Sequence, residues 1–328
     1  MDLRRNLASL PNNLPVGKTI DGRPLYDATF NTRRGYDMLL TNDDRGYANV
    51  ASIQVQKGFP FGLFVSGSYA YTNNQEVNPG TSSRSVSNYE LSAVTDPQHP
   101  GLAVSNYERR HRFTLAAEYS HSVASYFTNA APWKDMKTAV GIFLESRSGQ
   151  PFSWTFGDAN NGDTLAKIFG EENEFARRNR ELFYVPKAAN PDGTRDDVIL
   201  NGITEDELKV FLDRTGLSKY QGKIAPRNAF HSPWFTRIDA RIAQDLPNPL
   251  SGHRARFVID IENVGNLLNA KWGRAQAVPF PFIAPALNVD IDRATGKYVY
   301  STLRSNDPTR VDILQSVWRV GVGLMYDF

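Results

Sequence analysis

The last eleven residues of the chain, Trp318 to Phe328, alternate between two kinds of side chain with a period of two. Successive side chains of a β-strand point to opposite faces, so this period predicts a strand and not a helix. One face of the strand is entirely apolar and carries Trp318, Val320, Val322, Leu324, Tyr326 and Phe328. We expect such a strand to place that face in an apolar environment while its other face meets water.

The same alternation recurs upstream, which gives it weight that a single stripe lacks. About seven segments of the chain, the last one included, alternate in this way and predict antiparallel strands. The upstream segments run from Tyr47 to Lys57, Leu63 to Thr72, Arg112 to Tyr119, Val140 to Arg147, Trp234 to Ile242 and Ala255 to Glu262.

The links between these strands alternate between short and long. Two links are short turns, at 58–62 and 246–252, and a medium link runs from Ser120 to Asp135. The other links are predicted to be long loops, about 73–108, 149–232 and 265–312. Such asymmetry is typical of outer-membrane barrels, which have short turns on one side of the membrane and long loops on the other.

The remaining segments show little sustained periodicity. Residues 1–44 are rich in Pro, Gly, Asn and Arg and are predicted to be irregular. Within the second long loop, Thr204 to Glu207 resembles a helix start, which predicts a helix up to about Leu212. Within the third, a small hairpin is expected around Lys297 to Thr302.

The polar faces of the predicted strands carry charges of both signs. Arg237, Asp239 and Arg241 share one face of their strand, as do Arg256, Asp260 and Glu262. A hairpin about the 246–252 turn places the two rows side by side, so we expect ion pairs between the strands. Alternation alone fits a barrel in lipid and equally a soluble β-sandwich, such as a carbohydrate-binding module.

Composition excludes several other classes of protein. Hydrophobic residues make up 41% of the chain, yet no run approaches the roughly 18–20 apolar residues that a membrane-spanning helix needs. The net charge of +2 gives no support for a nucleic-acid partner. The absence of cysteine excludes disulfides, thiolate metal sites and cysteine nucleophiles.

The C-terminus resembles the signal that the outer-membrane barrel assembly machinery reads. That signal has a terminal aromatic residue, an apolar residue two positions before it and a glycine five positions before it. Phe328, Tyr326 and Gly323 match these positions, while Gly321 stands where the signal usually has a polar residue.

Several upstream segments resemble the C-terminal barrel of TonB-dependent receptors of the Oar-like type. In order and spacing they cover residues from about 45 to 328. These segments are Arg147-Ser148-Gly149-Gln150-Pro151-Phe152-Ser153, Asp158-Ala159-Asn160-Asn161-Gly162-Asp163, Phe183-Tyr184-Val185-Pro186, Arg227-Asn228-Ala229-Phe230, and Glu262 to Asn269 with Trp272-Gly273.

The resemblance implies an all-β fold, an antiparallel transmembrane β-barrel segment of about 7–8 strands covering residues 45–328, with long extracellular loops. Barrels of this family have about 22 strands around an N-terminal plug and take up ligands with energy from TonB. The implied location is the cell outer membrane, and the implied partners are outer-membrane lipid and the barrel assembly machinery. The stripe from Trp318 to Phe328 is then expected to face the membrane.

The plug, the TonB box and a signal peptide are not visible in the sequence. Met1 is followed by two arginines but by no apolar run of 7–15 residues, so no secretory signal is predicted. We therefore expect a truncated or split gene product, which contacts TonB only as part of a full-length receptor. Alone it is not expected to transport a ligand. The sequence does not indicate which ligand the receptor takes up.

Candidate sites for chemistry are few, and no enzyme, metal or cofactor is expected. Asp158, Asn160 and Asp163 form a candidate cation turn, although a turn held by its own polar side chains is the commoner structure. The five histidines are scattered without ligand spacing. Glu118 and Glu145 suit barrel-lining charges that meet arginines better than a glycosidase pair. Pro279 to Pro285 is either a ligand-contacting loop or, more commonly, a covered one.

Overall fold

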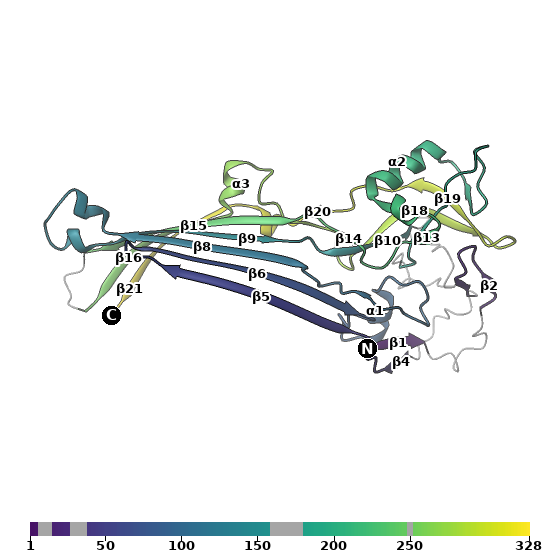
Figure 1. Cartoon of the computed structure of the whole chain (residues 1–328), viewed down its shortest axis with the longest axis horizontal. Helices are drawn as coiled ribbons and strands as arrows, with labels where there is room; N and C mark the ends of the chain where they lie inside the picture. The colour runs from purple at the N-terminus through teal and green to yellow at the C-terminus, as the bar shows by residue number, and fades with distance from the viewer. Residues whose placement is uncertain (6–14, 27–37, 158–179, 248–251) are drawn as a thin grey trace.

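A computed structural model describes residues 1–5, 15–26, 38–157, 180–247 and 252–328 of the chain. The chain is mostly antiparallel β-sheet with few helices. Figure 1 shows an elongated molecule in which a long sheet leads into a smaller folded region at one end. We call this smaller region the cap; it comprises the described residues of 77–110, 148–234 and 278–309 together with those before 45.

The long sheet is an antiparallel meander. Its order is β21-β16-β15-β9-β8-β6-β5, with the short β7 (Ala103–Val104) also paired with β6. The long strands are β5 (Tyr47–Gly58), β6 (Leu63–Glu76), β8 (His111–His121), β9 (Thr138–Arg147), β15 (Phe235–Leu246), β16 (Arg254–Glu262) and β21 (Arg319–Asp327). The predicted strands are thus confirmed, and the described residues form an open sheet whose edges are β5 and β21.

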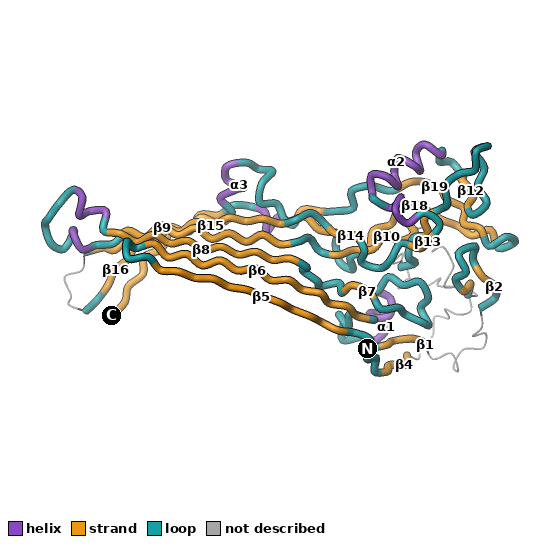
Figure 2. Tube along the Cα trace, in the orientation of Figure 1, coloured by secondary structure: helices purple, strands orange, loops and turns teal. Residues whose placement is uncertain are grey.

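Short and medium links join the strands at the end of the sheet opposite the cap (Figure 2). We call this the hairpin end. It contains the link after Gly58, the link after Leu246, and the β8–β9 connection with its 3-10 turns η3 (Val123–Tyr126) and η4 (Trp133–Asp135). The C-terminus lies at this end too, because β21 runs away from the cap.

The cap contains a second, mixed sheet that the sequence did not reveal. Five strands lie in the order β12-β19-β18-β10-β14, and β10 pairs in parallel with β18, as β12 does with β19. Their bounds are β10 (Pro151–Gly157), β12 (Val198–Leu200), β14 (Phe230–His231), β18 (Ile283–Asp292) and β19 (Lys297–Leu303). Two regions predicted to be long loops therefore contribute strands to one sheet.

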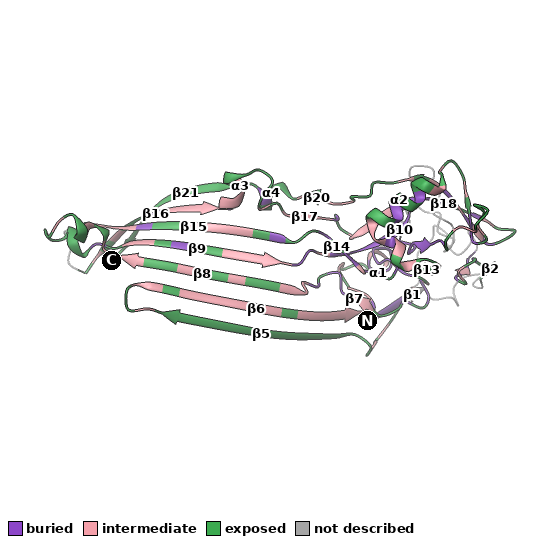
Figure 3. Cartoon of the chain, turned by 45° about the horizontal axis from the view of Figure 1, so that its top comes forward, coloured by how far each residue is buried: buried purple, intermediate pink, exposed green. Residues whose placement is uncertain are grey.

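Short elements complete the structure. Residues predicted to be irregular contain β1 (Asp2–Arg5), β2 (Gly17–Lys18), β3 (Pro24–Leu25) and β4 (Met38–Thr41). The others are β11 (Tyr184–Val185), β13 (Lys223–Ile224), β17 (Gln276–Ala277), β20 (Arg310–Val311), α1 (Ser85–Glu90), η5 (Leu217–Tyr220), α3 (Val264–Leu268) and α4 (Ile313–Ser316). Of these short elements, α3, α4, β17 and β20 lie along the long sheet, and the rest lie in the cap (Figure 3). Helices in the described part of the chain are all too short or too polar to cross a membrane.

Two local predictions inside the cap are confirmed. Helix α2 (Glu205–Thr215) begins with a capping box, in which the Thr204 side chain accepts from the backbone N–H of Glu207 and the Glu207 carboxylate accepts from that of Thr204. It ends at Gly216, whose positive φ of 72° suits glycine. The hairpin expected near Lys297 is formed by β18 and β19.

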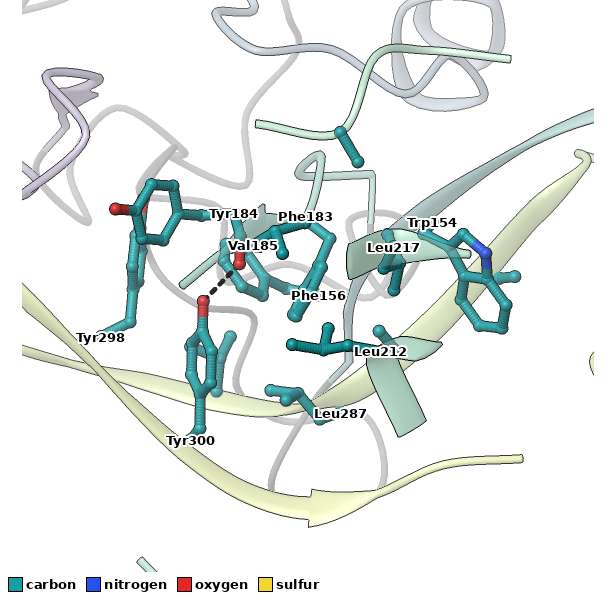
Figure 4. Close-up of a cluster of buried hydrophobic side chains, with 14 of the residues drawn as sticks. Trp154, Phe156, Phe183, Tyr184, Val185, Leu212, Leu217, Leu287, Tyr298 and Tyr300 are labelled. Atoms are coloured by element: carbon teal, nitrogen blue, oxygen red, sulfur yellow. Dashed lines mark hydrogen bonds between the residues drawn. The ribbon is translucent and has the colours of Figure 1, made fainter. Parts of the chain in front are cut away.

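The buried core of the molecule lies in the cap. Leu208 and Leu212 of α2 pack into an apolar cluster with side chains of the five-stranded sheet (Figure 4). Tyr300 donates a hydrogen bond of 2.5 Å to the backbone oxygen of Tyr184, which satisfies a phenol that is otherwise fully buried. Figure 3 shows the contrast with the long sheet, whose edge strands are exposed along their lengths.

A buried ion pair joins the β2–β3 hairpin to this core. Arg23 and Asp21 lie 2.7 Å apart, and both side chains are almost fully buried. Arg23 also donates to the backbone oxygen of Leu182 and to the hydroxyl of Tyr298. Burial alone would raise the pKa of Asp21, but the charge of Arg23 and hydrogen bonds from Arg23, Thr19 and Tyr298 outweigh it and lower that pKa.

This ion pair predicts a pH dependence. Because the pKa of Asp21 is lower in the folded chain, its contribution to stability is present above the unfolded value of about 3.8 and is lost as the pH falls below it. The gap in the free energy of unfolding between the wild type and Asp21→Asn should therefore shrink below pH 3.8. Urea titrations at several pH values measure this gap. Exposed Asp44→Asn is the control, and a gap that does not change with pH would contradict the prediction.

Candidate functional site

The apolar stripes of the seven long strands align into one continuous face. Residues opposite each other in an antiparallel pair lie on the same side of the sheet, so the register shows which stripes meet. Leu115 faces Leu144, and Leu144 faces Ile238. Further pairs on this face are Ile53 with Tyr69, Tyr69 with Phe113, Ala117 with Ile142, Ile242 with Ile259, Ile259 with Val322, and Phe257 with Leu324.

This face stays exposed although it is apolar. Val55, Val322 and Leu324 keep 68%, 67% and 69% of their surface accessible. Isolated exposed apolar residues are ordinary, but a contiguous apolar surface across a whole sheet marks a contact with a membrane or another protein. We call it the apolar face.

The opposite side of the long sheet, the polar face, carries ion pairs between and along strands. Arg241 pairs with Asp260 at 2.6 Å and Arg256 with Asp245 at 2.9 Å, and both pairs join β15 to β16. The predicted pairing between these strands is therefore confirmed. Other pairs are Arg112 with Glu145, Arg147 with Glu145, Arg237 with Asp239 and Arg319 with Glu262.

Glu118 and Glu145 are not brought together. The residue of β8 opposite Glu145 is Thr114, so Glu118 lies four positions further along, a distance of about 13 Å. Glycosidase carboxylates are about 5–9.5 Å apart. Glu145 instead lies 3.0 Å from Arg112 and 3.7 Å from Arg147, as expected of charges that line a polar face.

The residues of the C-terminal signal lie on and just after β21. Gly323 is opposite Val258 of β16. The hydroxyl of Tyr326 forms a hydrogen bond of 3.0 Å with Nδ1 of His253 at the hairpin end. Phe328 is 97% exposed, and Trp318, just before the start of the strand, is 47% exposed.

The candidate cation turn cannot be placed. Asp158, Asn160 and Asp163 lie outside the described residues. Within the described ranges no group of three or more His, Asp or Glu side chains is arranged to hold a metal ion. His111 contacts Tyr69, with 2.9 Å between its Nδ1 and the phenol oxygen, and does not approach His121 at the far end of the strand.

A pocket of about 340 Å³ lies where the long sheet meets the cap. Its floor is the end of β9 and the start of β15, and the short pair β17–β20 forms another wall. Alternation along the sequence gives no sign of this pocket, because most of its lining comes from predicted loops. Polar lining residues are Arg109, Arg147, Ser148, Gln150, Gln276, Arg310, Asp312 and Gln315, and aromatic ones are Phe235, Phe280 and Phe282.

Asn263 holds the β17–β20 side of this pocket in place. Its backbone N–H donates to the Asp239 carboxylate, and its side-chain amide donates to the backbone oxygens of Gly273 and Ser316. A Cβ at Gly273 would lie 1.9 Å from Oδ1 of Asn263, and the φ of +60° at Gly273 also favours glycine. The Asn263 and Gly273 segments, both part of the family resemblance, thus meet in space.

Arg227 and Asn228 tie three parts of the cap together. Arg227 is buried, and its guanidinium donates to the backbone oxygens of Val77 and Glu76 at the end of β6. Burial lowers the pKa of Arg227 to about 10, so it remains charged at neutral pH. Asn228 has a positive φ of 57° and bonds to Ser153 and Asn106. The sequence indicated this segment only as part of the family resemblance, and not as a link between distant parts of the cap.

Gly149 lies at the closest approach between two pocket segments. A Cβ at this position would lie 1.7 Å from the backbone oxygen of Ser232, closer than any real contact. The backbone of Ser232 is also fixed, because its N–H donates to the backbone oxygen of Gln150 at 2.9 Å. Only glycine lets the link after β9 pass the link before β15.

Comparisons of the chain with protein-family models, with curated proteins and with solved structures found no match. Family membership therefore stays a hypothesis that rests on the segments quoted above.

A Gly149→Ala variant should be strongly destabilised. The added methyl group forces the two segments apart, and overpacking against backbone costs roughly 1–3 kcal/mol or more. Gly101→Ala is the matched control, since nothing lies within 4 Å of the Cβ that it adds. Urea titration gives the free energy of unfolding of both variants. Similar values for the two would show that the close approach is not a constraint.

Proposed function

We propose that residues 45–328 form the C-terminal part of a transmembrane β-barrel, from an outer-membrane receptor of the TonB-dependent type that takes up ligands. One observation carries the proposal. The exposed apolar stripes are in register across all seven long strands, and the reverse side of the same strands carries ion pairs. A bilayer is the environment that accepts such a face over its whole width.

Strand length supports this environment. A strand needs about 9–11 residues to cross a bilayer at the tilt usual in barrels. Strands β16 and β21 have 9 residues, β9 has 10 and β8 has 11. Tryptophan and tyrosine favour the membrane–water interface, and Trp318 and Tyr326 stand near the two ends of the final stripe.

The polar face suits the interior of a barrel. Exposed ion pairs contribute little to stability, about 0–1 kcal/mol each, so stability alone does not explain a row of them. In a barrel they line a wet or plugged interior, where paired charges keep the wall polar without a large net field. The short links would then lie in the periplasm and the cap outside the cell.

The open edges support a partial barrel. Strands β5 and β21 run in the same direction, because they are the first and last of seven strands whose directions alternate. They therefore cannot pair with each other antiparallel, and antiparallel closure needs an odd number of further strands. Unpaired edges are not tolerated in lipid. The chain would thus act only within a complete receptor, assembled by the machinery that reads Phe328.

A β-sandwich module would bury the apolar face under a second sheet. The second sheet of this chain lies beyond the end of the long sheet and not over its face (Figure 1). The exposed fractions of 63% for Ile53 and 67% for Val322 agree with this placement. The geometry therefore favours the barrel over the sandwich.

Spin labels test the facing of β21 directly. The chain has no cysteine, so single cysteines can be placed at its successive positions. In phospholipid vesicles, where several copies of the chain must associate to pair their edge strands, labels at Val320, Val322 and Leu324 should be relaxed by oxygen, which concentrates in lipid. Labels at Gly321 and Met325 should be relaxed by a water-soluble nickel chelate. Equal access of the chelate to both sets would refute the membrane assignment.

Charge substitutions test the same assignment by energy. Val322→Arg should cost roughly 2–4 kcal/mol if this position faces the middle of the bilayer. Met325→Arg should cost less, because the polar face meets water; the remaining cost of about 0.2–1 kcal/mol comes from the like charge of Arg256 opposite it. Urea titration of the chain refolded in vesicles measures both losses. On a strand in water Val322→Arg would cost no more than Met325→Arg.

A further inference from the structure

The pocket at the cap end of the polar face has an excess of positive charge. Three arginines line it, Arg109, Arg147 and Arg310, against one carboxylate, Asp312. That carboxylate is already engaged, since it accepts from the backbone N–H of Gln315 at 3.3 Å and from its side-chain amide at 2.6 Å. The pocket therefore offers cationic donors whose charge its own walls do not neutralise.

Arg109 is the clearest of these donors. Its guanidinium donates to the Gln150 side-chain oxygen at 2.6 Å and to the backbone oxygen of Glu108 at 3.1 Å, both neutral acceptors. It forms no ion pair with any residue that the structure describes. Its half-buried position, and next the nearby charge of Arg147, lower the pKa of Arg109. The negative charge of a bound anion would offset both effects.

Gln150 fixes the direction of this guanidinium. While its oxygen accepts from Arg109, its nitrogen donates to the backbone oxygen of Asn106 at 2.9 Å. The hydrogen bond from the backbone N–H of Ser232 to the backbone oxygen of Gln150 holds the Gln150 backbone. Arg109 is thus positioned before any ligand binds, which lowers the entropy cost of binding.

The other two arginines differ in their freedom. Arg147 lies over the ring of Phe235, with 4.9 Å to the ring centre, and bonds to Gln315 at 3.3 Å. Its ion pair with Glu145 is long, at 3.7 Å. Arg310 on β20 is exposed and makes no side-chain ion pair within the described ranges. It can therefore swing toward a ligand at little cost.

An aromatic wall completes the pocket. Phe280 and Phe282 meet edge to face, with ring centres 5.5 Å apart, and Phe280 is 50% exposed. The rings belong to the Pro279–Pro285 run, for which the sequence left open a ligand-contacting or a covered role. Phe280 stands free to contact an apolar or planar group.

We infer that this pocket binds an organic anion, with a carboxylate or phosphate held by Arg109 and Arg310 and an apolar or aromatic body against Phe280. The volume of about 340 Å³ suits a small molecule or the end of a larger one. The assignment of this pocket as the ligand site of a receptor rests on the proposed function. Binding of an anion in the pocket does not depend on that function.

Fluorine NMR in detergent micelles tests this inference, with protein-free micelles as the blank. The probes are 3-(4-fluorophenyl)propionate, its neutral amide and 4-fluorophenyl phosphate. At least one anion should bind the wild type about tenfold or more tightly than the amide, because charge-assisted bonds are lost in the amide. The stronger of the two anions identifies which charged group the pocket takes.

Variants locate the binding. Arg310→Gln removes the charge of an exposed side chain, so it should weaken anion binding about tenfold without unfolding the cap. Arg109→Gln should weaken binding by a similar factor. Arg293→Gln, an equal charge change at an exposed turn of the cap, should leave binding unchanged. Equal binding of acid and amide, or equal effects of Arg293→Gln and Arg310→Gln, would overturn the inference. Neither result bears on the spin-label pattern of β21, so the two proposals can fail separately.

Discussion

Side chains alternate between the faces of a strand, so one register has to satisfy all seven strands of the long sheet at once. A slip of one residue between β15 and β16 would put Ile259 among the charges of the polar face and Asp260 among apolar side chains. The observed register does the opposite. It aligns Ile242, Ile259 and Val322 on one side and joins Arg241 to Asp260 on the other. The two faces, and everything proposed about them, depend on that register.

The cap depends on a different kind of interaction. Its apolar core buries aromatic and aliphatic side chains, but buried polar groups decide how its segments fit together. Arg23 with Asp21, Arg227, and Asn263 each bridge segments that are far apart in the chain. A buried charge or amide left without partners is costly, so these groups tolerate few alternative arrangements. Among these groups, Asn263 also holds the β17–β20 side of the pocket.

Alternation along a strand is a local signal, and for that reason the long strands, their faces and the Arg241–Asp260 pairing could be predicted. The same holds for the capping box at Thr204. The five-stranded sheet was missed because its parallel pairs, such as Ser153 with Ile283, join segments that carry no shared local period. The pocket was missed for the same reason, since Arg109, Gln150 and Arg310 come from three separate links.

The sequence by itself determined that the chain is all-β, which residues of each long strand share a face, and that one face is apolar while the other is charged. These properties follow from the period of two with which apolar and polar residues alternate along each strand. Tertiary structure decided that the apolar stripes form one exposed surface, that predicted loops fold into a cap with its own core, and that three arginines and Phe280 line one pocket. Such properties depend on which distant segments pack together, and no local pattern encodes that.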